Sequence, residues 1–111
     1  MNKLRRQELR TLSYKTQLLL MDSVDFTADE SIFQIHDIAD DLYKLLDEEI
    51  MCRDNIPENL QYSDRYEKSD AACENMEEAY DLLDNIELGD STEFIFDSLK
   101  KAIIYINDAC L

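Results

Sequence analysis

The stretch DNIPENLQYSDRYEKSD, residues 54–70, divides this chain of 111 residues and contains its only proline. Ile56 comes directly before Pro57 and is therefore disfavoured in the helical region of backbone space. Pro57 itself suits the first position of a short helical turn, because the N–H that it lacks would be unpaired there anyway. Ser63 or Asp64 can cap a new helix. The stretch thus predicts a structural bend between two helices.

Two long helices are predicted on either side of this bend. The first follows a capping-box spacing, Thr27 to Glu30, and runs to about Arg53. The second runs to about Leu88, with Gly89 placed as the residue that ends it. Both carry apolar seams at alternating steps of three and four: Ile32, Ile35, Ala39, Leu42 and Leu46 in the first, and Tyr66, Ser69, Cys73, Met76, Tyr80 and Leu83 in the second.

Shorter helices are predicted at the two ends of the chain. One runs from about Asn2 to Met21 with poor amphipathicity, and the other starts near Asp90–Glu93 and continues to the C-terminus. A single glycine and a single proline cannot supply the tight turns of a β-rich fold. We therefore expect one all-α domain over residues 1–111, a small antiparallel bundle of about four helices with coiled-coil-like crossings.

The net charge of −15 is unevenly distributed. Residues 1–20 carry five basic side chains and one acidic one, a net of +4, whereas residues 21–111 carry 25 acids and six bases, a net of −19. Such a field repels nucleic acid and anionic membranes and favours a basic protein partner. Because a domain of this size has a small core, we also allow for a homodimer that completes it.

The chain has no apolar run of membrane-spanning length and no signal-peptide pattern. Its three cysteines, Cys52, Cys73 and Cys110, are widely spaced and include no C-x-x-C motif. This pattern favours free thiols in a reducing compartment, so we expect a cytoplasmic protein.

Few residues in the chain suggest catalysis. The sole histidine, His36, has no partner at metal-ligand spacing, so neither a zinc site nor a bundle di-iron site is expected. Acidic pairs such as Asp37-x-x-Asp40 and Glu74-x-x-Glu77 have the spacing with which all-α nucleotide pyrophosphatases hold Mg²⁺. With 26 acids such pairs arise by chance. The leading prediction is a non-enzymatic protein without cofactor or metal, and the Mg²⁺-dependent hydrolase stays open as an alternative.

One side of the helix after the bend is strongly acidic. Neighbouring like charges on a helix each cost roughly 0.2–0.5 kcal/mol, and few lysines offset them here. Helices usually avoid such rows of like charge, so a row that is kept at a cost in stability indicates that its charges serve a function. An acidic helix alongside would approach the density of duplex DNA, one charge per about 1.7 Å. We predict that this face binds the basic partner, with mere solubility as the alternative. The predicted partner-binding residues are Glu67, Asp70, Glu74, Glu77, Glu78, Asp81, Asp84 and Glu87.

Four segments of the chain resemble short acidic helical-hairpin proteins encoded by bacterial phages and mobile elements. They are MNKLRRQEL at residues 1–9, DEEI at 47–50, NIPENLQYS at 55–63 and DSLKKAIIYI at 97–106. The resemblance covers about two thirds of the chain, and the sequence departs from it around residues 22–33 and 88–94. It supplies no catalytic residue. It implies a protein that acts by binding another protein, such as a restriction or CRISPR nuclease.

Overall fold

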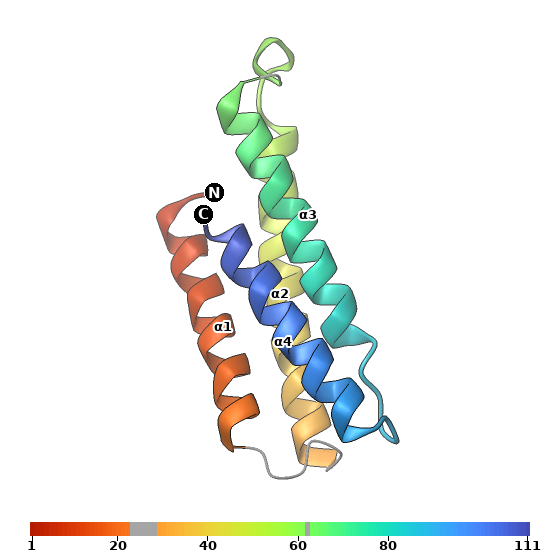
Figure 1. Ribbon diagram of the computed structural model, residues 1–111. Helices are drawn as coiled ribbons and strands as arrows, with labels where there is room; N and C mark the ends of the chain where they lie inside the picture. Colours follow the sequence, from red (N-terminus) through yellow and green to blue (C-terminus); the bar gives the residue numbers. More distant parts are fainter. Residues whose placement is uncertain (23–28, 62) are drawn as a thin grey trace.

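The computed structural model describes residues 1–22, 29–61 and 63–111, and these residues form four α-helices with no strand among them (Figure 1). The helices are α1 (Lys3–Asp22), α2 (Asp29–Asp54), α3 (Asp64–Asp84) and α4 (Thr92–Ala109). A short 3-10 helix, Glu58–Leu60, lies between α2 and α3. The predicted all-α class is confirmed.

The helices run alternately up and down in one bundle (Figure 1). Helix α2 packs against α1 and α3, and α4 packs against α3 and α1. Helices α1 and α3 therefore lie diagonally opposite one another. Both ends of the chain lie at the same end of the bundle, where the Cys110 Sγ lies 3.9 Å from the Arg6 carbonyl oxygen. This is the antiparallel arrangement that short connections favour.

The α2–α3 hairpin projects beyond the ends of α1 and α4 (Figure 1). As a result the molecule is elongated, with extents of 50 × 21 × 18 Å. The bend around Pro57 forms the tip of this projection, and Ile56 beside it is buried while Leu60 is exposed. The bend thus sets α2 and α3 side by side along their length.

The predicted seams form the core. Their residues from α2 are buried without exception, and those from α3 are buried except for the half-buried Tyr66 and Tyr80. Helix α4 adds Ile95, Leu99 and Ile106. Helix α1 contributes fewer apolar residues to the core, because two of its leucines, Leu4 and Leu18, are exposed.

Local capping accounts for the starts of α3 and α4. The Ser63 hydroxyl accepts a hydrogen bond from the Tyr66 N–H at 3.3 Å, so Ser63 is the N-cap of α3. It is one of the two residues, Ser63 and Asp64, that were predicted as possible caps. Pro57 stands one position earlier than predicted, as the residue before the 3-10 helix. The capping box of Thr27 lies outside the described residues.

The prediction that the third helix reaches Leu88 was wrong. Helix α3 ends at Asp84, and Asn85 turns the chain. Gly89 has a positive φ of 95°, but it serves the α3–α4 loop and does not end the helix. Helix α4 is capped by Ser91, whose hydroxyl accepts from the Phe94 N–H at 3.2 Å, while the Asp90 carboxylate accepts from the Glu87 N–H within the loop.

Candidate functional site

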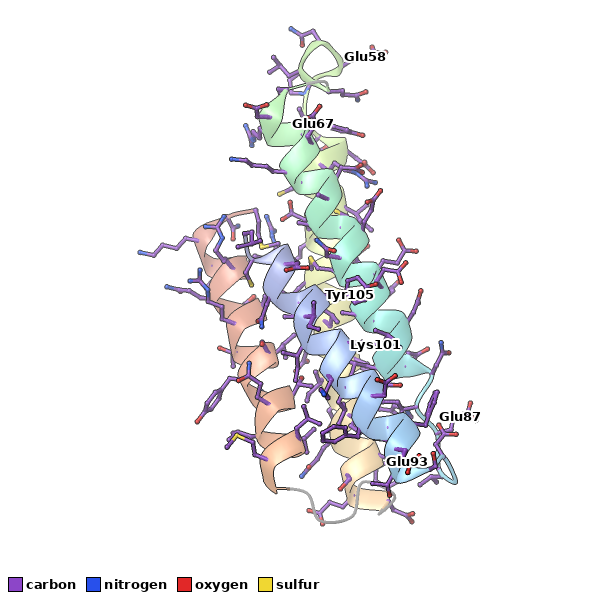
Figure 2. All side chains as sticks on the ribbon, in the orientation of Figure 1. Glu58, Glu67, Glu87, Glu93, Lys101 and Tyr105 are labelled. Atoms are coloured by element: carbon purple, nitrogen blue, oxygen red, sulfur yellow. The ribbon has the colours of Figure 1, made fainter. Side chains whose placement is uncertain are left out.

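The predicted partner-binding residues lie along one side of the α2–α3 hairpin. Figure 2 shows Glu67 near its tip and Glu87 at the far end, in the loop after α3. All eight residues are exposed except Asp70, which is half-buried. Glu87 therefore does not belong to the helical stripe, because the helix ends three residues before it. The other seven lie on α3 as predicted.

Asp40 and Asp54 of α2 lie beside this stripe, and Asp47, seven residues from each, is on the same side of α2. At one end of the two helices, the charges of Asp40 and Asp84 both raise the pKa of the Tyr80 hydroxyl. At the other end, Arg53 forms ion pairs with both Asp54 and Asp70. Fourteen residues separate the two ends on each helix, which makes these segments antiparallel partners over about 21 Å. We call the surface that they form the acidic face; its members are Asp40, Asp47, Asp54, Asp70, Glu74, Glu77, Glu78, Asp81 and Asp84.

Not all acids of α2 lie on this surface. The side chains of Asp37, Asp41 and Glu48 line a groove against α1, on another side of the helix. Glu49 is fully buried. The reason is the 100° rotation per residue of an α-helix, which distributes acids that are close in sequence over several faces.

Positive charge is scarce on the acidic face. Among the described residues, Arg53 is the cation that forms ion pairs there, with 2.9 Å to Asp70 and 3.1 Å to Asp54. Burial disfavours its charge, but the hydrogen bonds and charges of these carboxylates prevail and raise the Arg53 pKa. The carboxylates from Glu74 to Asp84 have no ion pair in the described part of the chain.

A pair of tyrosines interrupts the acidic face. The rings of Tyr43 on α2 and Tyr80 on α3 have centroids 5.3 Å apart and are tilted by 52°. Tyr43 remains 54 % exposed, and the two rings line a shallow hollow together with Asp40 and Lys44. Partial desolvation and the nearby charges of Asp84 and Asp40 raise the pKa of the Tyr80 hydroxyl, so the ring stays neutral at physiological pH.

A second polar centre, inside the protein, was not predicted. The Glu49 carboxylate accepts from the Arg5 Nε at 3.1 Å and from the Ser69 hydroxyl at 2.5 Å, and the Met1 nitrogen lies 3.6 Å away. Arg5 also donates through its terminal nitrogen to the Cys52 Sγ at 3.1 Å. Burial disfavours the Arg5 charge, yet the contact with Cys52 and the charge of Glu49 raise its pKa.

The sequence did contain a signal for this centre. Glu49 stands at the next position of the α2 seam after Leu42 and Leu46, and Ser69 is a seam residue of α3. A charged residue on a buried seam needs a partner of opposite charge. Arg5 meets that need from 44 residues away, a pairing that local patterns do not encode.

The remaining candidates for chemistry are few. Half-buried His36 lies with its Nε2 2.6 Å from the Ile86 carbonyl oxygen, where the protonated nitrogen donates and ties α2 to the α3–α4 loop. Cys52 is exposed, whereas Cys73 and Cys110 are buried, and all three thiols are free. Within the described residues no three metal-ligating side chains stand close enough to hold an ion. The magnesium alternative stays a prediction.

Comparison of the chain with protein-family models, with curated proteins and with solved structures finds no match in any of the three. Within the described part of the chain, no helix combines the length and the apolar character that crossing a bilayer requires.

Proposed function

We propose that this protein is a non-enzymatic, acidic interaction protein that binds a basic protein surface through its acidic face. The observation that carries the proposal is the alignment of two antiparallel acidic segments, whose described ion pairs lie at one end only, around Arg53. A surface with so little internal compensation attracts a positively charged partner.

The spacing of the charges supports a partner that normally binds nucleic acid. Nine carboxylates occupy about 21 Å of helix axis, one per roughly 2.3 Å, whereas duplex DNA presents one charge per about 1.7 Å. The acidic face can therefore occupy the basic groove of such a protein and exclude its nucleic acid. The acids on the α1 side of α2 do not enter this count, so the comparison rests on the surface carboxylates alone.

The tyrosine pair supports the same kind of partner. Exposed aromatic rings attract arginine and lysine side chains by cation–π contact, worth about 0.5–1 kcal/mol at an exposed site. Tyr43 and Tyr80 lie between the carboxylates at the Asp40 end of the face. A basic side chain that docks there meets a ring and a carboxylate together.

The finer form of the proposal follows from the resemblance to proteins of phages and mobile elements. In that setting the partner is a nuclease of a restriction or CRISPR system in the cytoplasm, and this protein inhibits it by imitating nucleic acid. No cofactor or metal takes part. The alternative is a structural or oligomerisation module whose acidity only keeps it in solution.

Affinity capture from cell extract at low and at high salt, read by mass spectrometry, tests the proposal. We expect basic nucleic-acid-binding proteins to be retained at low salt and released at high salt, because the contacts are electrostatic. The triple variant Glu74→Gln, Glu77→Gln, Asp81→Asn should lose them. Asp70 is left unchanged because its removal would leave Arg53 with one partner fewer.

A matched control removes the same charge from other surfaces. Glu58→Gln, Glu93→Gln and Asp108→Asn together neutralise three exposed acids outside the acidic face. This control variant should capture the same proteins as the parent chain. Equal loss in both variants would mean that only net charge matters, and equal retention in both would refute the acidic face as the binding surface.

A further inference from the structure

Helix α1 carries two regular stripes that face in opposite directions. The inward one consists of Arg5, Leu9, Leu12, Thr16 and Leu19, of which the first four are buried. The outward one also advances by alternating steps of three and four, and each of its side chains is exposed. We call it the outer stripe of α1; it consists of Leu4, Gln7, Thr11, Tyr14, Leu18 and Met21.

The outer stripe of α1 contains no charge, unlike the outward stripes of the other helices. On α2 the exposed residues at the same spacing include four charged side chains of six, on α3 four of five, and on α4 three of five. The stripes compared are Phe33, Asp37, Asp40, Lys44, Asp47 and Met51; Glu67, Ala71, Glu74, Glu78 and Asp81; and Phe94, Asp97, Lys101, Ile104 and Asp108. In a chain with 33 % charged residues, an uncharged stripe six positions long has the composition of a helix–helix contact.

The exposed area of the outer stripe is large. Leu4 is 64 % exposed, Tyr14 62 % and Met21 80 %. The hydroxyl of Thr11 donates to the Gln7 carbonyl oxygen at 3.1 Å, so it is satisfied within the helix and its methyl group is free to pack. Leu18 adds its side chain at the rim of a neighbouring hollow.

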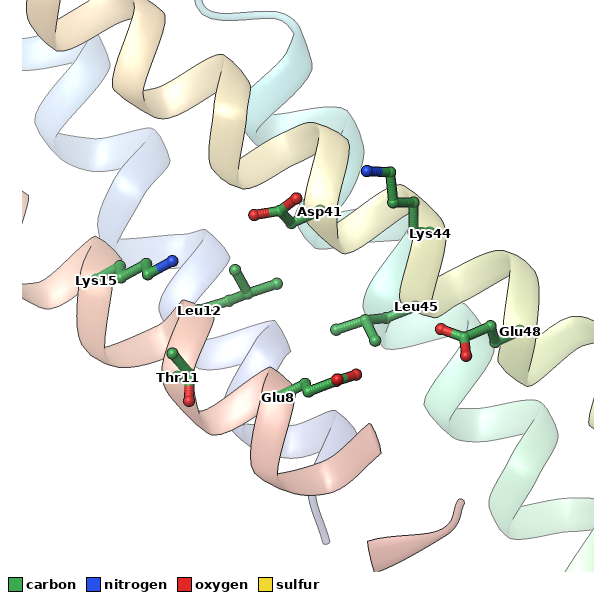
Figure 3. A pocket seen from close by; sticks show the side chains of 8 residues that line it. All are labelled: Glu8, Thr11, Leu12, Lys15, Asp41, Lys44, Leu45 and Glu48. Atoms are coloured by element: carbon green, nitrogen blue, oxygen red, sulfur yellow. The ribbon is translucent and has the colours of Figure 1, made fainter. Parts of the chain in front are cut away.

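The two flanks of the outer stripe have opposite character. On the α4 side lie Arg6 and Arg10, whose charges act on the thiol of Cys110, the residue after α4. Lys3 lies one heptad before Arg10. On the α2 side two hollows of about 350 and 420 Å³ share Lys15 and Asp41 and form one groove. Its rim carries more acids than lysines, and Figure 3 shows Glu8, Asp41 and Glu48 together with Lys15 and Lys44 around the first hollow. The rim residues are Glu8, Lys15, Asp37, Asp41, Lys44 and Glu48.

We propose that the outer stripe of α1 pairs with the same stripe of a second copy of this chain, in a parallel two-fold dimer. A two-fold axis parallel to the helices brings the basic flank of each copy against the groove rim of the other, where four acids outnumber two lysines. Lys3 then faces Glu8, whereas Arg10 faces Lys15. The same axis sets Leu4, Tyr14 and Leu18 opposite their own counterparts, as the core layers of parallel coiled coils require.

The antiparallel dimer lacks both advantages. It joins basic flank to basic flank and acidic to acidic, and its layers set Gln7 against Leu18 and Thr11 against Tyr14. An anionic membrane would likewise meet the acidic rim of the groove and be repelled. A second copy in parallel orientation is therefore the occupant that the charges select.

This inference is independent of the proposed function. Since α1 and α3 are diagonal in the bundle, a dimer through α1 leaves the acidic face of each copy open. Residues 1–20, with a net charge of +4, also come together where the repulsion between two acidic molecules is smallest.

Sedimentation equilibrium of the full chain tests the interface. The parent protein should have twice the 13.0 kDa mass of one chain, and Tyr14→Glu should have the mass of one, because two carboxylates would face each other across the dimer. The control Ile104→Glu changes a residue of similar exposure on α4 and should remain dimeric. Circular dichroism shows that each variant is folded. A monomeric parent at its highest soluble concentration, or a dimeric Tyr14→Glu, overturns the proposal.

Oxidation of Leu18→Cys in a Cys52→Ser background tests the orientation. In the parallel dimer the two new thiols are opposite each other and should form a disulfide, seen as a covalent dimer on a non-reducing gel. In the antiparallel dimer Leu18 lies opposite Gln7, which separates the thiols by about 16 Å along the axis. A dimeric protein that forms no cross-link overturns the parallel arrangement.

Discussion

The carboxylate of Glu49 lies fully buried between three helices, with α1 supplying Arg5 and α3 supplying Ser69. Two neighbouring glutamates thus have opposite environments, since Glu48 faces the groove on the surface. Every buried side-chain nitrogen and oxygen of the described residues has a hydrogen-bond partner. The cost of burying this charge is offset only while all of its partners remain in place.

Replacing Glu49 by alanine should therefore destabilise the protein strongly. The change leaves the buried Arg5 guanidinium without its carboxylate, and breaking such a pair costs about 3–5 kcal/mol. Urea unfolding followed by circular dichroism measures the loss. The control Glu48→Ala, an exposed site one residue earlier, should stay within about 0.5 kcal/mol. Similar midpoints for the two variants would show that the Arg5–Glu49 pair does not stabilise the fold.

The three thiols should differ sharply in reactivity. Burial raises the pKa of Cys73 to about 11 and also raises that of Cys110, so both remain protonated near pH 8, whereas Cys52 is exposed. The thiolate is the reactive form. A chromogenic disulfide reagent at pH 8 should label one thiol per chain in the native protein and three in denaturant. The variant Cys52→Ser should show no rapid labelling, and rapid native labelling of a second thiol would contradict this ranking.

At the scale of the elements, sequence patterns correctly predicted the features that depend on residues close together in the chain. The α2 and α3 seams and the Ser63 cap depend on residues within one or two turns, and they were confirmed. The end of α3 was predicted four residues too late. A glycine after an apolar seam is typical of a helix end, but Gly89 lies in the loop that follows the helix. The partner of Glu49 and the exposure of the α1 stripe depend on which helices become neighbours, and residues within one or two turns do not encode that.

The acidic face shows the same division. The stripe on α3 was predicted because one helix contains it, up to Asp84. Which acids of α2 join it depends on the rotation of α2 about its axis in the bundle, and this rotation directs Asp40 toward α3 and Asp41 toward α1.

A charge exchange on α1 tests the proposed dimer at the scale of this element. In a parallel pair of heptads, Lys3 of one copy faces Glu8 of the other. Lys3→Glu should weaken the dimer several-fold, since each exposed ion pair is worth about 0.2–1 kcal/mol and two are lost. Adding Glu8→Lys restores opposite charges and should recover the parent dissociation constant in sedimentation equilibrium. A double variant weaker than Lys3→Glu alone would argue against this pairing.

At the scale of the whole molecule, charge is separated across the bundle. The basic segment, α1, lies diagonally opposite α3 and its acidic stripe. The core includes neither the outer stripe of α1 nor the acidic face, because the buried side chains point inward between the helices. The two surfaces are therefore free to serve separate contacts, one between copies of the chain and one with a basic partner.

A surface kept for binding at the expense of stability should become more stable when it is neutralised. The variant Glu74→Gln, Glu77→Gln, Asp81→Asn removes at least five like-charge neighbours on α3, each destabilising by roughly 0.2–0.5 kcal/mol. We expect a gain of about 1–2.5 kcal/mol at low salt, which raises the melting temperature by roughly 4–8 °C per kcal/mol.

Salt distinguishes this cause from better packing. Added sodium chloride screens the repulsion, so the parent protein should become more stable with salt and the gain of the variant should shrink. Thermal unfolding of both proteins across a salt series, with the control Glu58→Gln, Glu93→Gln, Asp108→Asn alongside, provides the measurement. The control lacks the close neighbours of the α3 stripe and should gain less at low salt. If neutralising the acidic face brings no stability at low salt, its charges are already compensated within the molecule, and the attraction for a basic partner that we infer from them is lost.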